Sequence, residues 1–202
     1  MDDPYPFGEL DSLIKGEVLT DNLSRTLYAT DASVYRELPL AVVLPRDITD
    51  VSMIVRFAAR HNIPLIPRGA GTSLAGQVVG KGLVVDVSHH MNRIIEINAK
   101  EGWAEVQPGV VLDDLNREAA SFNLFFGPET STSNRCTMGG MVANNSCGAH
   151  SMIYGSTRDH ILEVTGYLAS GEEVTFRPVQ KWEFDKKCRE EGHEGEIYRL
   201  MR

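Results

Sequence analysis

Short apolar runs alternate with one amphipathic segment in the first half of the chain. Three runs have strand length: "AVVLP" (41–45), "IPLIP" (63–67) and "GLVVDVS" (82–88). Between the first two, apolar residues recur at helical spacing behind Thr49, the predicted N-cap. These apolar residues are Val51, Ile54, Val55 and Ala58. The order strand, helix, strand, loop, strand predicts an α/β lobe.

The pattern changes after about residue 93. Residues 93–107 read as two alternating strands around a turn near Lys100–Gly102, and a helix is predicted from about Leu112 to Ser121. Residues 161–178 form two further alternating segments around "SGEE", which is a hairpin signal. Residues 181–202 have the composition of a charged helix.

These patterns divide the chain into three parts. Residues 1–37 are mixed and polar, and we expect them to form an N-terminal arm or helix laid over the body. Residues 38–99 are expected to form a first lobe. Residues 100–202 are expected to form a second lobe, within which the chain stops before a closing element.

Composition excludes several classes of function. The 202 residues are 42% hydrophobic, which is enough for a buried core, and carry a net charge of −8 without a basic run. Nucleic acid is therefore excluded as a partner, because binding its backbone needs a clustered basic face. No apolar stretch approaches the roughly 20 residues of a membrane span. The acidic, proline-containing N-terminus is unlike a signal peptide, so a cytoplasmic location is expected. The three cysteines lack metal or disulfide spacing.

Residues 67–77, "PRGAGTSLAGQ", directly follow a predicted strand. A P-loop would need lysine where Gln77 stands, and the glycines are spaced two residues too widely for a Rossmann fingerprint. Glycines still free the backbone to present successive N–H groups to an anion such as pyrophosphate, and Thr72 and Ser73 add hydroxyl donors. A glycine-rich surface turn without a ligand is the alternative.

A second glycine-rich stretch, "TMGGMVANNSCG" (137–148), supplies amide and hydroxyl side chains suited to phosphate or ribose. It lies about sixty residues further along, in the other predicted lobe. Alone it would also suit an ordinary turn. Together the two stretches indicate a long ligand held between two lobes, and a dinucleotide has that shape.

Five motifs follow in order within residues 38–176: "PRGAGTSLAGQ", "VVDVSHHMNRIIEIN", "VQPGV", "GPETSTSNRCTMGGMVANNSCGAHSMIYGSTRDHILEV" and "SGEEV". Together they resemble the FAD-binding domain of the vanillyl-alcohol oxidase (PCMH) type. Within that family they are most similar to the D-lactate dehydrogenase and glycolate oxidase branch, as is the arm "LYATDASVYRELPLAVVLP". The resemblance implies an α+β fold with a small parallel-strand lobe, an antiparallel-sheet lobe and FAD between them.

The resemblance also implies cofactor-binding residues. The first pyrophosphate loop would comprise Pro67, Arg68, Gly69, Ala70, Gly71, Thr72, Ser73, Gly76 and Gln77. The second FAD-contacting segment would comprise Pro128, Thr137, Gly139, Gly140, Asn144, Ser146 and Gly148. Tyr154 and Gly155 match the family's "YG", and the backbone of Ile161 would meet the adenine end. Pro108, in the turn between the lobes, would contact the flavin.

Two positions indicate how FAD would be held. Many relatives attach it covalently through a histidine in the first loop, and here that place is Thr72. A second attachment point, a cysteine before the second Gly-Gly, corresponds to about Ser133, with Cys136 out of register. We therefore expect non-covalent FAD.

The resemblance implies oxidation of a D-2-hydroxy acid of the lactate or glycolate type. Electrons would pass to an iron–sulfur region or quinone, and the full-length protein could lie against the membrane. The catalytic base would come from a C-terminal cap rather than from His89, His90, His150 or His160, and no metal site is expected. The alternatives are a flavin reductase of the cell-wall precursor type, the flavin subunit of a molybdenum hydroxylase, and a non-catalytic FAD-binding fragment.

Overall fold

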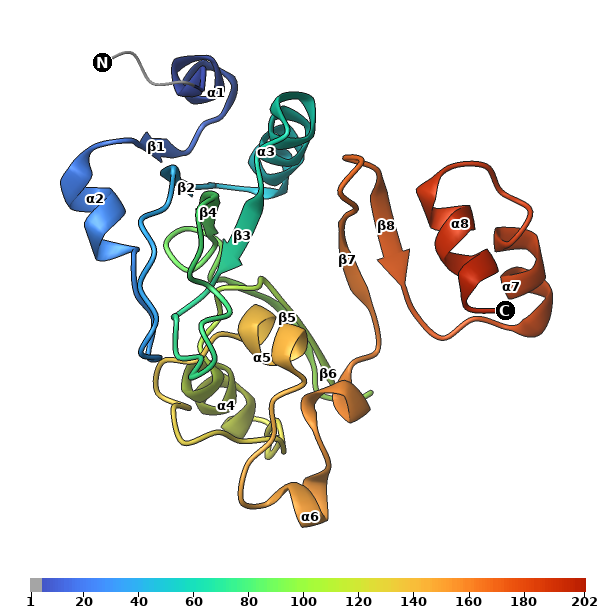
Figure 1. Ribbon diagram of the computed structural model, residues 1–202. Coiled ribbons are helices and arrows are strands. Elements are labelled where there is room, and N and C mark those ends of the chain that lie inside the picture. Colours follow the sequence, from blue (N-terminus) through green and yellow to red (C-terminus); the bar gives the residue numbers. More distant parts are fainter. Residues whose placement is uncertain (1–4) are drawn as a thin grey trace.

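A four-stranded sheet forms the first half of the molecule. The computed structural model describes residues 5–202, and the strand order of this sheet is β1-β2-β4-β3 (Figure 1). The three strands β2 (Ala41–Leu44), β4 (Leu83–Asp86) and β3 (Leu65–Arg68) run parallel to one another. This confirms the predicted parallel lobe. At the opposite edge, β1 (Glu17–Leu19) pairs antiparallel with β2, so the N-terminal arm also contributes a strand.

Helices on one face of this sheet cover the main core. α1 (Phe7–Leu13) and α3 (Ile48–His61) bury Leu10, Ile54 and Phe57 against inward-facing residues of β2 and β4. Burying side chains of this size stabilises the fold by about 1.5–3 kcal/mol each. Val42 and Val84 face the other side, where they pack beneath the arm that carries α2 (Asn22–Leu27).

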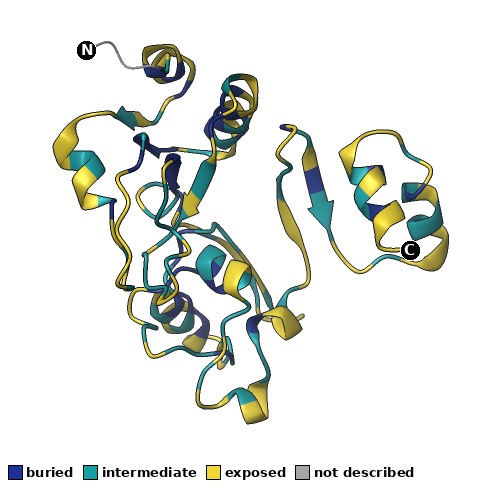
Figure 2. Cartoon of the chain, in the orientation of Figure 1, coloured by how far each residue is buried: buried dark blue, intermediate teal, exposed yellow. Residues whose placement is uncertain are grey.

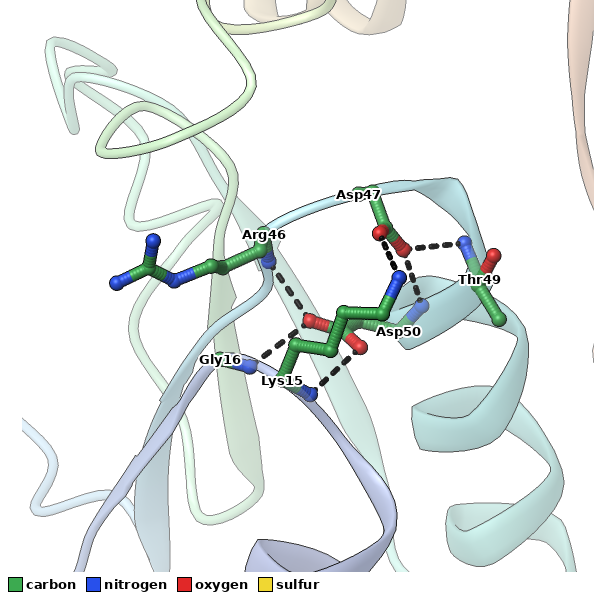
Figure 3. Close-up of polar contacts among 6 residues, drawn as sticks. All are labelled: Lys15, Gly16, Arg46, Asp47, Thr49 and Asp50. Carbon is green, nitrogen blue, oxygen red and sulfur yellow. Dashed lines mark hydrogen bonds and ion pairs between the residues drawn. The ribbon is translucent and has the colours of Figure 1, made fainter.

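The start of α3 is fixed by two aspartates (Figure 3). Asp47 is the N-cap, and its carboxylate accepts hydrogen bonds from the N–H groups of Thr49 and Asp50. The prediction of Thr49 as the cap was therefore wrong, because the helix begins two residues earlier. The buried Asp50 carboxylate accepts from the main-chain N–H groups of Lys15, Gly16 and Arg46, at 2.8–2.9 Å. Asp50 thus connects the residues just before β1 with the segment between β2 and α3.

A hairpin and short helices follow the sheet. β5 (Ile94–Asn98) pairs with β6 (Trp103–Val106), so the turn at 99–102 lies inside one hairpin. α4 (Leu112–Ala120) matches the predicted helix. Then come α5 (Met138–Asn144), α6 (Ser151–Tyr154) and the 3₁₀ turn η1 (Thr157–His160). A second core joins the faces of α4 and α5 to β6 and includes Leu115, Cys136 and Met141.

The last segment stands beside the rest of the molecule (Figure 1). β7 (Val164–Tyr167) and β8 (Glu173–Phe176) form the predicted hairpin, and α7 (Lys181–Lys187) and α8 (His193–Leu200) provide the predicted helical tail. Within residues 5–202 the hairpin β7–β8 is a sheet of its own, separate from β5–β6. Buried residues concentrate in β2, β4 and α3, whereas no residue of β7 is buried (Figure 2).

Candidate functional site

The first glycine loop begins where β3 ends, at the carboxyl edge of the parallel sheet. Its backbone turns at Gly71 (φ +65°) and Gly76 (φ +71°), and both values lie in the left-handed region that favours glycine. Across the described residues, the main-chain N–H groups from Gly69 to Ser73 have no hydrogen-bond partner. Ser73 is bound within the loop, since its hydroxyl pairs with the Gln77 side chain. The loop therefore offers consecutive free donors of the kind that hold anions.

The first loop also contacts the N-terminal arm. Arg68 extends its side chain toward the arm, where Nη1 donates to the carbonyl oxygen of Thr30 at 2.9 Å. Its guanidinium lies 5.1 Å from the centre of the Tyr28 ring. The Tyr28 hydroxyl in turn donates to Asp86 Oδ2 at 2.7 Å. Burial, and then the Asp86 carboxylate, raise the pKa of Tyr28 above its ordinary value, so the hydroxyl stays protonated.

The second glycine stretch is a helix rather than the expected loop. Thr137 caps α5, and Gly139 and Gly140 lie in its first turn. The N–H groups at this helix start are already bound: Gly139 donates to the Pro108 carbonyl and Gly140 to the Thr137 hydroxyl, while Met138 and Met141 donate to other carbonyls. A Cβ on Gly139 would lie 2.7 Å from Pro108 Cβ. These glycines therefore permit close packing and leave few donors for a ligand.

The two segments lie against each other. A Cβ on Gly69 would lie 2.2 Å from Thr137 Oγ1, so only glycine fits at that position. Gln77 Nε2 donates to Asn144 Oδ1 at 2.6 Å, which joins the end of the first loop to the end of α5. The structure thus brings together the first loop, Pro108 and the α5 residues of the predicted set, from two predicted lobes.

A cavity of about 410 Å³ opens between these elements. Its lining residues are Ala70, Ser88, Asn92, Gly109, Val111, Asp114, Arg135 and Thr137. This volume is in the range of small-molecule sites. Of the lining residues, Asp114 has its carboxylate paired with Arg117 at 2.7 Å. The free N–H groups of the first loop, with the Arg135 cation, fit the pyrophosphate that the resemblance implies.

The remaining six residues of the predicted set are Pro128, Ser146, Gly148, Tyr154, Gly155 and Ile161. The contacts of three of them are with residues in the same part of the chain. The Ser146 carbonyl accepts from Thr157, a Cβ on Gly148 would lie 2.3 Å from the Glu129 carbonyl, and Tyr154 packs against Gly127. In the described part of the chain, no hydrogen bond joins any of the six to residues 67–77. Their assignment to the cofactor remains a prediction.

Sequence reasoning missed several residues of the cavity. Ser88 and Asn92 follow β4, and Arg135 precedes α5. A signal was present, because polar residues just after a buried parallel strand lie at the edge where ligands bind. "SHHMN" (88–92) directly follows β4, and that position could have nominated the first two.

Cys136 and the histidines lie outside the cavity. Cys136 is buried in the second core, where its sulfur accepts from the Thr130 hydroxyl at 3.2 Å. His90 and His150 face Glu17 and Glu129, at 3.5 and 2.6 Å, and His160 contacts the Tyr154 carbonyl. Among the described residues, no histidine lines the cavity and no cluster of metal-ligating side chains occurs. None of the helices in residues 5–202 is long and apolar enough to cross a membrane.

Comparisons with known proteins identify the family. The sequence model of the FAD binding domain family matches residues 39–177. D-2-hydroxyglutarate dehydrogenase of Pseudomonas putida is 42% identical over 191 residues, which are 93% of this chain and 19% of that protein. Glycolate oxidase subunit GlcD of Bacillus subtilis is 37% identical over 155 residues, 76% of this chain and 33% of that protein. The chain thus spans about a fifth to a third of these relatives.

A solved structure of p-cresol methylhydroxylase with substrate bound has the same fold. It superposes with a TM-score of 0.73 at 20% identity, covering 83% of this chain and 34% of that one. This confirms the PCMH-type fold that the motifs implied. The chain belongs to the FAD binding domain family, and its cofactor is FAD.

Proposed function

We propose that this chain is the FAD-binding portion of a dehydrogenase that oxidises a D-2-hydroxy acid. When bound, FAD supplies the acceptor for the hydride that leaves the substrate α-carbon. The observation that carries the proposal is the row of free N–H groups from Gly69 to Ser73, held against Thr137 beside the cavity. Relatives named as a D-2-hydroxyglutarate dehydrogenase and a glycolate oxidase subunit are 42% and 37% identical to this chain, over 191 and 155 residues.

The chain's own residues bind and orient the cofactor. We assign the pyrophosphate to the N–H groups of Gly69–Ser73, where hydrogen bonds to a charged group contribute about 1.5–3 kcal/mol each. Gly139 lets α5 approach Pro108 closely, and Gln77 fixes α5 to the loop through Asn144. Thr72 offers no nitrogen for a covalent bond, so FAD is held non-covalently. We assign the acceptor of the substrate's hydroxyl proton to another part of the full-length protein.

D-2-hydroxyglutarate is the first substrate to test, with D-lactate and glycolate next. Four relatives named for the first acid are 41–45% identical to this chain and a fifth is 35% identical, whereas the glycolate oxidase subunits are 36–37% identical. In this proposal, electrons pass from the flavin to an iron–sulfur region. The full-length protein lies in the cytoplasm, against the membrane.

Anaerobic bleaching of the flavin tests this function. The purified full-length protein should be yellow, and adding D-2-hydroxyglutarate should bleach its long-wavelength band, whereas L-2-hydroxyglutarate should not. A yellow protein that no D-2-hydroxy acid bleaches would support the alternative of a non-catalytic flavin binder. A colourless protein that does not take up added FAD would contradict the binding assignment itself.

A further inference from the structure

A closed loop of the N-terminal arm, residues 28–37, lies over the glycine loop; we call it the strap. Its ends are joined, because Glu37 N–H donates to the Ala29 carbonyl at 3.0 Å and Thr30 bridges to Arg36. Tyr28 anchors its base to the sheet through the hydrogen bond to Asp86, a residue 4% exposed at the end of β4. The strap is thus a folded unit attached to the carboxyl edge of the sheet.

The strap holds the glycine loop at three points. Arg68, the last residue of β3, donates to the Thr30 carbonyl at 2.9 Å and stacks on the Tyr28 ring. Ala32 N–H donates to the Gly71 carbonyl at 3.0 Å. The Tyr35 ring lies against Gly76, where a Cβ would come within 2.6 Å of it. The beginning, middle and end of the loop are therefore each fixed from the same side.

These contacts leave the main-chain N–H groups of the glycine loop available to an anion. The Gly71 carbonyl, which would repel a phosphate, is bound to the strap, while the N–H groups of Gly69–Ser73 stay free. Ordering the backbone of a flexible residue costs about 1–2 kcal/mol, so a loop ordered before the ligand arrives binds it more tightly. The Arg68 guanidinium, a group that binds phosphates in other proteins, is here engaged by carbonyl oxygens of the strap.

We propose that the strap pre-orders the glycine loop for FAD, and that Arg68 and Tyr28 are positioning residues rather than ligands of the cofactor phosphates. This inference rests on the proposed use of the glycine loop for FAD. It differs from the role that motif resemblance implies for Arg68, which is a direct phosphate contact. Tyr28 and Ala32 distinguish the two roles, because both lie on the strap and a phosphate-binding Arg68 would not need them.

The test uses Tyr28→Phe and Arg68→Met in the full-length protein, stripped of flavin and titrated with FAD. Tyr28→Phe keeps the ring beneath the guanidinium but removes the hydrogen bond to Asp86. Each variant should weaken FAD binding by about fivefold to tenfold, as expected for the loss of one hydrogen bond. The double variant should bind no more weakly than the weaker single, because both changes release the same strap. Tyr167→Phe is the matched control: its hydroxyl also donates to a carboxylate, at 2.8 Å, but on the β7–β8 hairpin.

Amide hydrogen exchange of the flavin-free protein supplies a readout independent of FAD. The Ala32 amide should be protected in the wild type and in Tyr167→Phe. It should exchange faster in Tyr28→Phe and in Arg68→Met. If Tyr28→Phe binds FAD like the wild type, the proposal is overturned. It is also overturned if Arg68→Met loses FAD while Ala32 stays protected, since Arg68 would then be a phosphate ligand. A wild type that binds no FAD would refute the proposed function, and Ala32 exchange would still report on the strap.

Discussion

Three glycines in the candidate site are constrained in different ways. Gly69 leaves room for the Thr137 hydroxyl, Gly139 lets α5 approach Pro108, and Gly71 adopts a left-handed backbone beneath Arg68. The first two constraints are steric, and the third is both conformational and steric. Substitutions at the three positions should therefore fail in different ways.

Gly71→Ala should weaken FAD binding. Its Cβ would lie 2.6 Å from Arg68 Nη2, and its φ of +65° costs an L-residue about 1–2 kcal/mol, so the loop should shift. Gly102→Ala is the control, because Gly102 has φ +72° but nothing within 4 Å of a Cβ. Thermal unfolding should show a comparable loss of stability in the two variants. Titration with FAD should show a loss of affinity only in Gly71→Ala. Equal affinities would mean that the shape of the loop does not matter for the cofactor.

Denaturation should release all of the flavin from the full-length protein. Thr72 cannot bond the flavin methyl group, and Cys136 is buried in the second core. After acid precipitation, the absorbance of FAD should appear in the supernatant with none in the pellet. Flavin retained in the pellet would show a covalent link and would overturn the non-covalent assignment.

At this scale the sequence predicted that the glycines of residues 67–77 mark a close approach. It could not predict what they approach. Gly69 and Gly76 approach Thr137 and Tyr35, which are distant in sequence, and Arg68 turns toward the arm. Such contacts depend on the assembled fold rather than on local spacing.

At the scale of the elements, hydrogen bonds to Asp47 and Asp50 join α3 to the N-terminal arm. One carboxylate caps the helix from the surface, and the other lies buried beneath it, bound to three main-chain N–H groups (Figure 3). Because the Asp50 carboxylate accepts all three hydrogen bonds, removing it leaves all three N–H groups unpaired.

Asp50→Ala should destabilise the fold by about 3–5 kcal/mol, because it strands three donors at a buried position. Asp47→Ala, a change at the partly exposed helix cap, should cost only about 1 kcal/mol. Urea unfolding of both variants measures the difference. Similar losses for the two would contradict a structural role for the buried carboxylate.

The contribution of Asp47 should depend on pH. The hydrogen bond from Lys15, followed by the Asp50 main-chain N–H, lowers the pKa of Asp47 below its ordinary value. The carboxylate therefore stabilises the folded protein above the ordinary range of the group, and the benefit disappears as pH falls through the lowered pKa.

Asp47→Asn retains a capping side chain without the charge. It should be less stable than the wild type at pH 7, by under about 1 kcal/mol at this partly exposed site. The gap should close as pH falls below about 4. Lys15→Met removes the donor to Asp47, so at pH 7 it should already lose most of the stability that Asp47→Asn loses. A gap that stays constant with pH would mean that the charge of Asp47 contributes nothing.

The strands from β2 onward, α3, α4 and both hairpins follow from hydrophobic periodicity, but β1 and α5 do not. "TMGGMVAN" (137–144) has two glycines in its first turn, a composition that favours a loop. Tertiary contacts override that preference: Met138 and Met141 are buried, and carbonyls of residues 108 and 110 bind the first N–H groups. Local propensity therefore predicts the wrong element at the second segment.

At the scale of the whole molecule, two segments that are distant in sequence meet at one cavity. The first loop comes from the parallel sheet and α5 from the second core, and they meet through Gly69 and Thr137 and through Gln77 and Asn144. The two glycine-rich stretches and the resemblance predicted this meeting, whereas hydrophobic periodicity did not. The boundary at residues 99 and 100 remains an expectation; it falls within the turn of the β5–β6 hairpin.

The most direct test of the central claim compares amide exchange in the flavin-free and FAD-loaded full-length protein. We predict that the N–H groups of Gly69–Ser73, which have no protein partner among the described residues, exchange rapidly without flavin and become strongly protected with it. The N–H groups of Met138–Met141, already hydrogen-bonded, should change little. Unchanged exchange at Gly69–Ser73 in a protein saturated with FAD would contradict the account.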